Sequence, residues 1–292
     1  MRGVATRVPA PVLFVVGAVS MYVGAALAVG LFTRLPPTAV AVLRLLGAAL
    51  VLLAWRRPPR SAWRGARFWR ASAFGLATAL MNIAFYEAIA RLPLGTAVAI
   101  EFCGPVAVAA VASRRPRDVA AVLFAAVGVL LIADVRWSGS PSGVLWALGA
   151  ATMWAAYIVL GKRVASGGNG LDDMTVGFVV AAVVLSPLLF AGGTGALAAL
   201  ADPVVLVLAV GVGMLSSVVP YVLDQVVLRR LGQARFAVLL ALLPATATVV
   251  GLIGLAQVPT VLEFLGIAAV VAAVSLRSRD GDTPAAVGRT GG

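Results

Sequence analysis

The sequence predicts an all-α integral membrane protein with ten transmembrane helices, arranged as two inverted five-helix repeats. Hydrophobic residues make up 62% of the 292 residues and charged residues only 12%, against about 25% in a soluble domain. Long apolar runs alternate with short polar gaps along most of the chain, and basic residues gather in every second gap. A water-facing surface cannot be built from such a sequence, whereas a bundle of membrane helices can.

Ten apolar runs are long enough, or nearly so, to cross a bilayer as helices. The apolar–polar alternation of a transmembrane strand does not occur in them. The expected spans are 11–31, 37–54, 71–91, 94–113, 119–133, 143–161, 174–190, 204–228, 233–255 and 260–276. The fifth and seventh are short, so we expect them to cross with little tilt or to extend into the flanking loops.

The basic residues indicate the orientation. Nineteen of the 23 lie at the two ends of the chain and in alternate gaps, whereas the other gaps hold only Arg34, Arg91 and Arg136. The positive-inside rule then places both termini in the cytoplasm, and we expect the protein to lie in the cell (inner) membrane. The net charge of +12 does not indicate a nucleic-acid partner, because the basic residues follow the topology and do not line one face.

Five spans per half is an odd number, so the second half must cross the bilayer upside down relative to the first. Inverted repeats are typical of secondary transporters, whose substrate sites lie between the halves near the midplane. The stretch 17–22 resembles 149–154 at the matching place in each half. We expect a cytoplasmic N-terminus at 1–10, a first repeat at 11–136, a second repeat at 137–277 and a disordered cytoplasmic tail at 278–292.

Metal and cofactor chemistry is not expected. The chain has no His, and Cys103 is its only Cys, which excludes an internal disulfide and His/Cys zinc or haem sites. The expected partners are a small-molecule substrate, protons and the lipid bilayer; a homodimer stays open.

Ionisable residues inside the apolar runs are candidate functional residues, because each costs roughly 2.5–3.5 kcal/mol at a span centre. Arg44 and Glu101 each lie seven positions into a span, or about 10 Å deep, so we expect them to be partners. One interpretation is a fixed ion pair between two helices. The other is a protonatable Glu101 whose contact with Arg44 changes with substrate.

The third and eighth spans carry further polar residues. Asn82 and Tyr86 lie one turn apart on one face of the third span, and Tyr221 and Gln225 repeat this spacing in the eighth. Glu87 in the third span and Asp224 in the eighth are candidate gate or proton-relay acids at opposite mouths. The alternative is a pair of helix-end charges, with Glu87 paired to Arg91 four residues on.

Aromatic residues and prolines also recur in the two halves. Tyr22 and Trp154 occupy matching positions in the first and sixth spans and are candidates for a cavity wall, although simple packing is the alternative. Pro105 and Pro244 lie midway along the fourth span of each half. A proline there removes one backbone hydrogen bond and kinks the helix, and the freed carbonyl must be buried in protein or line a cavity.

One long stretch resembles a known family. Its motifs are Met81-Asn82, Phe85-Tyr86, Pro93-Leu94-Gly95, Ala97-Val98-Ala99, Glu101-Phe102-Cys103-Gly104-Pro105 and Ser113-Arg114-Arg115-Pro116, with Leu43-Arg44-Leu45, Pro220-Tyr221 and Leu223-Asp224 elsewhere. These resemble the threonine/homoserine exporters of the EamA group, within the drug/metabolite transporter superfamily. The resemblance runs from the first span to the tenth.

The resemblance implies ten helices in two inverted repeats, a central cavity, and export of small amino acids, with proton coupling the usual expectation. The chain departs from similar proteins at two places. Leu243 stands where they often carry Glu, and Ala256-Gln257 where they often carry Gly-Glu. Any proton role therefore falls on Glu101, Glu87 or Asp224.

Two other functions are weighed against amino-acid export. An exporter of cationic or lipophilic drugs would use the same architecture. A membrane-embedded lipid enzyme would need clustered catalytic groups, for which only the neighbours Asp172 and Asp173 stand out. We therefore expect a transporter and not an enzyme.

Overall fold

The computed structural model describes residues 8–112, 116–137, 140–165, 170–190, 198 and 201–278. These residues form helices and connecting turns, with no strand among them. The expected disordered tail at 278–292 lies, apart from Ser278, outside the described residues, and so do residues 1–7 of the expected cytoplasmic N-terminus.

The first half of the chain contains helices whose bounds lie close to the predicted spans. They are α2 (Ala10–Leu31), α3 (Pro37–Arg56), the short 3-10 helix η1 (Arg60–Trp63), α4 (Gly65–Ile89), α5 (Leu94–Glu101), α6 (Cys103–Ala112) and α7 (Pro116–Trp137). Pro37 is the first residue of α3, where a missing N–H and a fixed φ suit a helix start. The helix ends where Arg57 adopts a left-handed conformation, with φ 46°.

The second half contains a similar series, with one irregular turn. Its elements are α8 (Pro141–Ala165), α9 (Gly170–Leu185), η2 (Ser186–Phe190), α11 (Pro203–Gly213), the π-helical turn η3 (Met214–Val218), α12 (Val219–Leu240), α13 (Leu242–Leu255) and α14 (Val261–Ser278). The boundary predicted between the eighth and ninth spans, at 229–232, is wrong. The chain stays helical there, and the break falls at Ala241, three residues before Pro244.

The helices have the length and composition of a multi-pass membrane protein. Six described helical stretches of 20 to 25 residues are apolar enough to cross a bilayer. Four shorter apolar stretches accompany them, at Leu94–Val108, Val122–Ile132, Leu242–Leu255 and Val261–Ser275. Many of their outward side chains are apolar and exposed, as lipid contact requires.

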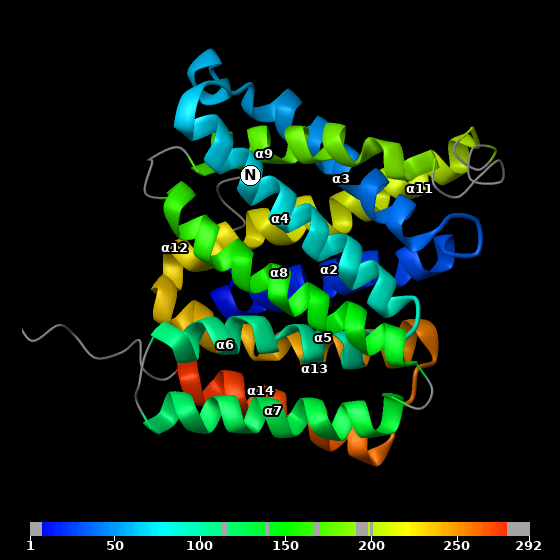
Figure 1. Ribbon diagram of the computed structural model, residues 1–292, viewed down its shortest axis with the longest axis vertical. Helices are drawn as coiled ribbons and strands as arrows, with labels where there is room; N and C mark the ends of the chain where they lie inside the picture. The colour runs from blue at the N-terminus through cyan, green and yellow to red at the C-terminus, as the bar shows by residue number, and fades with distance from the viewer. Residues whose placement is uncertain are drawn as a thin grey trace, which may run out of the picture.

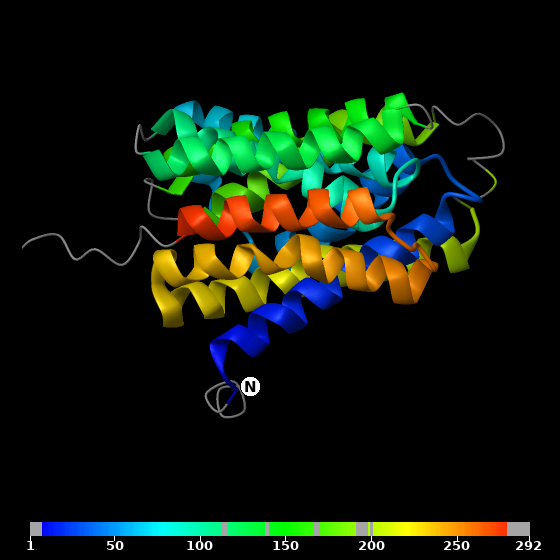
Figure 2. The ribbon, with the colours of Figure 1, turned by 90° about the horizontal axis from the view of Figure 1, so that it is seen from below.

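The helices run roughly parallel and stack along the long axis of the molecule (Figure 1). Helices α3 and α9 pack together towards one end of that axis, and α7 and α14 pack together at the other. The first turn of α2 and the last turn of α14 lie at the same side of the bundle in both views (Figures 1 and 2).

Helix pairs in the bundle come in matched sets. Helix α4 packs on α8 and α9, while α12 packs on α2 and α11 packs on α3. Helices α5 and α6 pack on α8, while α13 packs on α2. Glycines allow the closest of these contacts: a Cβ at Gly75 in α4 would overlap the backbone of Gly177 in α9, and one at Gly128 in α7 would overlap Gly266 in α14.

Candidate functional site

A cavity of about 500 Å³ lies among these helices, within the range of small-molecule sites. Helices α2, α3, α4, α5, α6, α8, α9, α12 and α13 and the turn η3 contribute side chains to its wall. Eight of the residues singled out from the sequence line it: Tyr22, Arg44, Asn82, Tyr86, Glu101, Pro105, Trp154 and Asp224. These residues come from both halves of the chain.

Arg44 projects from the middle of α3 and is held by three neutral groups. Its Nε donates to Ser217 Oγ at 3.0 Å, its Nη1 to Asn82 Oδ1 at 2.6 Å, and its Nη2 to the carbonyl oxygen of Ser216 at 2.8 Å. Its guanidinium carbon also lies 5.5 Å from the centre of the Tyr86 ring, a cation–π distance. A guanidinium has five N–H donors, so two remain without a described hydrogen-bond partner.

The Ser216 carbonyl is available because of Pro220. A proline has no N–H, so residue 220 cannot bond the carbonyl four residues earlier. The chain widens into the π-turn η3 here, as is frequent at functional sites. The neighbouring Leu215 carbonyl accepts from Ser20 Oγ of α2 at 2.8 Å. Two backbone carbonyls of the π-turn are thus satisfied by side chains from the first half.

Asn82 is fixed in one orientation. Its Nδ2 donates to the carbonyl of Thr78, one turn earlier in α4, at 2.7 Å. This leaves Oδ1 facing Arg44. Tyr86, one turn further along, is fully buried, and its hydroxyl has no hydrogen-bond partner among the described residues.

Glu101 is the last residue of α5, and its side chain has no hydrogen bond or ion pair to any described residue. The helix is interrupted at Phe102 and resumes as α6 at Cys103. Pro105 explains the interruption, because it offers no N–H to the Glu101 carbonyl. Pro244 follows a helix break at Ala241 by the same three residues.

The ion pair expected between Arg44 and Glu101 is not formed. None of the ion pairs within the described residues includes either side chain. The physical reason is that other groups, most of them in the opposite half, bond the guanidinium. The carbonyl freed by Pro220, together with Ser217 and Asn82, takes up the guanidinium. Both residues line the same cavity without contact.

Glu87 does not line this cavity, so its predicted place in the cavity wall is not observed. It is 7% exposed and forms the alternative pair with Arg91, at 2.6 Å between Oε2 and Nη1. Its Oε1 accepts from the backbone N–H and the hydroxyl of Thr38 at 3.1 and 2.6 Å. Glu87 therefore caps the start of α3.

The structure describes the backbone of the eighth predicted span, but only some of its side chains. Asp224 lines the cavity with no described hydrogen-bond partner. The side chains of Tyr221 and Gln225 lie outside the described residues. Tyr22 and Trp154 both line the cavity, and the Trp154 ring meets Phe102 edge to face, with centroids 4.8 Å apart.

The cavity begins at one end of the bundle and extends past its middle, as far as Ala25 in α2, Ala41 in α3 and Tyr86 in α4. Its wall includes Phe14 near the start of α2, Leu52 near the end of α3, and Met174 near the start of α9. The opposite ends of α2 and α3 are densely packed, with Ala28 and Ala39 both 0% exposed. The cavity is therefore placed towards the side where α2 begins and α14 ends (Figures 1 and 2).

The cavity-side ends of the helices also carry two ion pairs between the halves. Arg56 bonds Asp172 at 3.2 Å and Arg67 bonds Asp173 at 2.6 Å. The two aspartates lie in the first turn of α9, where negative charge is favoured. Each is thus engaged by its own arginine, and the pair does not form the clustered acid site that a lipid enzyme would need.

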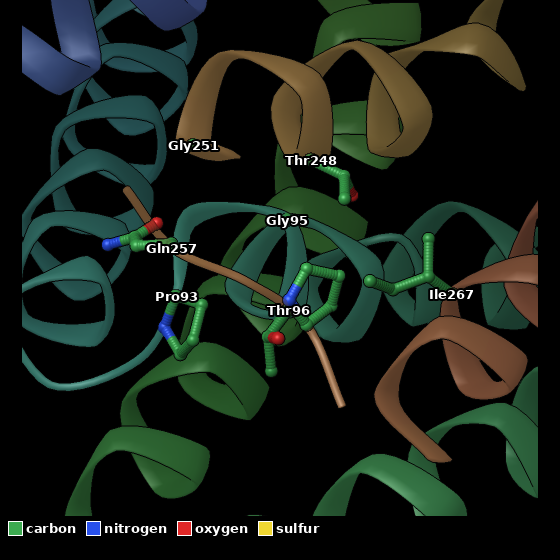
Figure 3. A pocket seen from close by; sticks show the side chains of 8 residues that line it. Pro93, Gly95, Thr96, Thr248, Gly251, Gln257 and Ile267 are labelled. Atoms are coloured by element: carbon green, nitrogen blue, oxygen red, sulfur yellow. The ribbon is translucent and has the colours of Figure 1, made fainter. Parts of the chain in front are cut away.

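A second, water-sized cavity of about 10 Å³ lies between α5, α13 and α14 (Figure 3). Gln257, at one of the departures from similar proteins, points its Oε1 to the backbone N–H of Leu94 at 2.8 Å. Nearby, Glu263 is fully buried and accepts from Thr96 Oγ1 at 3.0 Å and from the Thr260 N–H at 2.9 Å. This is a helix-capping arrangement, and neither residue lines the large cavity.

Sequence reasoning missed three contributors to the main site. The Ser20 hydroxyl donates to the Leu215 carbonyl beside the one that Arg44 bonds, and the Thr78 carbonyl holds Asn82, which is a partner of Arg44. Pro220 leaves the Ser216 carbonyl without a helical partner. Ser20 and Thr78 carry no signal, because hydroxyl residues that bond their own helix are common in apolar spans. The signal for Pro220 was present: a Ser-Ser pair three to four residues before a proline inside an apolar run.

A many-spanning helical protein with a charged cavity between its two halves is, by class, a membrane transporter. The second half, residues 141–279, matches the model of the EamA-like transporter family. The chain is 35% identical over 279 residues to "Threonine/homoserine exporter RhtA" of Salmonella typhimurium, covering 94% of this chain and 93% of the relative. It is also 35% identical to the protein of the same name from Escherichia coli K12, over 90% of this chain and 88% of that one.

A solved structure known only as "Crystal structure of protein" has the same fold, with a TM-score of 0.59 at 18% identity. It is matched over 91% of this chain and 96% of that one. The chain belongs to the EamA-like transporter family of the drug/metabolite transporter superfamily, as a relative of the threonine/homoserine exporters. It is a multi-pass membrane protein.

Proposed function

We propose that the protein exports small amino acids of the threonine/homoserine type across the inner membrane, by alternating access and coupled to protons. The observation that carries this proposal is Arg44. It is a permanent positive charge in the middle of a membrane helix, and its described partners are all neutral. A charge inside a membrane helix whose hydrogen-bond partners are all neutral is unfavourable, so the cavity is suited to a solute that brings a carboxylate.

The donor pattern of Arg44 fits that role. Three of its five N–H groups hold it in place, and one on each of Nη1 and Nη2 remains. Arginine binds carboxylates through two such parallel donors, which fixes both partners in one plane. The side chain is thus oriented before substrate arrives, which reduces the entropy lost on binding.

The ammonium group of an amino acid would meet negative charge in the same cavity. Glu101 and Asp224 line it, and neither has a described ion-pair partner. Glu101 comes from the first half and Asp224 from the second, so a zwitterion between them and Arg44 would contact both halves. Because the halves move relative to each other in alternating access, such contacts let the substrate bind the inward-open and outward-open states with different affinity.

Proton coupling is assigned to Glu101. It is a carboxylate at a helix break, on the cavity wall, with no described hydrogen bond to fix its protonation state. A group that binds either a proton or the substrate ammonium makes the two compete. Competition at one site is sufficient to exchange an inward proton for an outgoing amino acid.

We further propose that 11–136 and 137–277 are inverted five-helix repeats with both termini cytoplasmic. The matched packing pairs support the repeats, and the common side of the first and last described turns supports an even number of crossings. The basic residues place that side in the cytoplasm. The cavity, placed towards it, then corresponds to the inward-facing state of alternating access.

The second candidate is the export of cationic drugs. The cavity wall carries two acids against one arginine, and the rings of Trp55, Trp154 and Tyr157. Such a wall suits aromatic cations. Amino-acid export is preferred because a cationic solute would offer no group to the free N–H donors of Arg44 and would add positive charge beside it.

Efflux from proteoliposomes with an imposed proton gradient tests both candidates. Labelled threonine and homoserine, other amino acids and cationic dyes would be loaded in parallel. We expect gradient-dependent efflux of small amino acids. Efflux of dyes with none of any amino acid would establish the second candidate and overturn the first.

A further inference from the structure

The groups that contact Arg44 are all neutral. Asn82 is the one among them whose place a carboxylate would usually take. The groups are a serine hydroxyl, a backbone carbonyl, the Tyr86 ring and the Asn82 amide. The shortest of the hydrogen bonds is the one from Arg44 Nη1 to Asn82 Oδ1, at 2.6 Å. A carboxylate at this position would be the usual partner of a membrane-embedded arginine.

The orientation of the Asn82 amide is not free. Its Nδ2 is held by the Thr78 carbonyl at 2.7 Å, so Oδ1 is the only atom it can present to Arg44. The oxygen of an asparagine carries a dipole and no net charge. Asn82 therefore positions the guanidinium while leaving its full positive charge for a ligand.

We propose that Asn82 is a specificity-determining residue, which makes the cavity select solutes that carry a carboxylate by orienting Arg44 without neutralising it. The inference rests on the proposed function and names the feature of the substrate that the site reads. Replacing Asn82 by Asp, which has nearly the same shape, would supply the counter-ion from within the protein. A solute carboxylate would then face a neutral ion pair in place of a free positive charge, with Glu101 and Asp224 already on the wall.

The test compares two ligands on three proteins. The ligands are threonine and threoninol, in which the carboxylate is replaced by a hydroxymethyl group and the ammonium is kept. The proteins are the wild type, N82D and N82L, where leucine has the same branching as asparagine but neither its hydrogen bonds nor a charge. Ligand binding is measured by competition against labelled threonine for the wild type, and directly by thermal shift for all three.

We expect the wild type to prefer threonine over threoninol by on the order of 30-fold or more, because threoninol has no carboxylate to pair with the membrane-embedded charge of Arg44. N82D should lose this preference or reverse it. N82L should bind both ligands more weakly but keep the preference to within about fivefold of wild type, because Arg44 stays uncompensated. A merely structural role of Asn82 would make the two variants alike.

The outcomes separate the inference from the function on which it rests. If the wild type binds threonine no better than threoninol, the proposed recognition of carboxylates fails. If the wild type prefers threonine and N82D prefers it equally, the recognition stands and the role of Asn82 is overturned. Should N82D not fold, S217D places a carboxylate at Arg44 Nε instead, and its preference is expected to fall in the same way.

Discussion

Arg44 donates a hydrogen bond to the carbonyl oxygen of Ser216, which Pro220 leaves without a helical partner. The proline withholds the N–H that would bond the Ser216 carbonyl, and Arg44 Nη2 donates to that carbonyl at 2.8 Å from the other half of the chain. The carbonyl left free by the helix irregularity in the second half thus finds its hydrogen-bond donor in Arg44, which the first half contributes to the cavity. Under the proposed role of Arg44, substrate recognition and the conformation of η3 therefore depend on each other.

Replacing Pro220 by Ala tests this link. Alanine supplies an N–H that competes with Arg44 for the Ser216 carbonyl and favours regular helix in place of η3. We expect thermal stability in detergent to be kept or raised, because a proline inside a helix costs about 3 kcal/mol. Threonine efflux should nevertheless fall. Wild-type efflux at equal membrane abundance would show that the π-turn has no part in transport.

Glu101→Gln tests proton coupling. Glutamine keeps the size of the side chain but cannot take up or release a proton, so we expect gradient-driven efflux to be lost while exchange without a gradient continues. The matched control is Glu87→Gln, which alters an acid that caps α3 and lies off the cavity wall. This control should still respond to the gradient. A wild-type gradient response in the Glu101 variant would remove Glu101 from the mechanism.

Glu263→Gln is expected to destabilise the protein without changing substrate affinity. Its carboxylate accepts from Thr96 Oγ1, the Thr260 N–H and Thr260 Oγ1. An amide keeps only one acceptor oxygen, so at least one of these donors loses its partner, at a loss of about 1–3 kcal/mol where the donor is the buried Thr96 hydroxyl. Thermal unfolding in detergent measures the loss. An unchanged unfolding temperature would mean that the cap does not stabilise the fold.

Cysteine accessibility tests which side of the bundle is open. Cys103 is the only cysteine, so Cys103→Ala gives a cysteine-free background. Ala48 and Ala39 are matched positions on α3, 2% and 0% exposed, but only Ala48 lines the cavity. We expect a membrane-impermeant thiol reagent to label Ala48→Cys from the cytoplasmic side and to leave Ala39→Cys unlabelled. Labelling of Ala48→Cys only from outside would invert the proposed orientation.

Much of the fold follows from the sequence because the bilayer leaves few alternatives to helices. Apolar runs gave helix positions to within a few residues for most spans. The error at 229–232 arose from reading Arg229 and Arg230 as a loop, whereas the helix continues to Leu240. Charge patterning marks the side of the membrane and does not mark where a helix must end.

Many of the residues that line the site could be predicted from the sequence, but the hydrogen bonds and ion pairs between them could not. Equal depth and opposite charge indicated that Arg44 and Glu101 belong together, and both line the cavity. Depth along a helix does not give the direction of a side chain around it, and the acceptor freed by Pro220 could be recognised only once α3 and η3 were seen together. Glu87 illustrates the converse, since the simple i to i+4 pairing with Arg91 holds.

The most direct test of carboxylate recognition is the binding of labelled threonine to purified protein carrying Arg44→Gln, compared with wild type. Glutamine removes the charge and the fork of donors, so we expect affinity to fall by on the order of 30-fold or more, with Arg44→Lys between the two. Folding would be checked by gel filtration and thermal unfolding. Unchanged threonine affinity in a folded Arg44→Gln protein would contradict the role of Arg44 as the receptor for the substrate carboxylate.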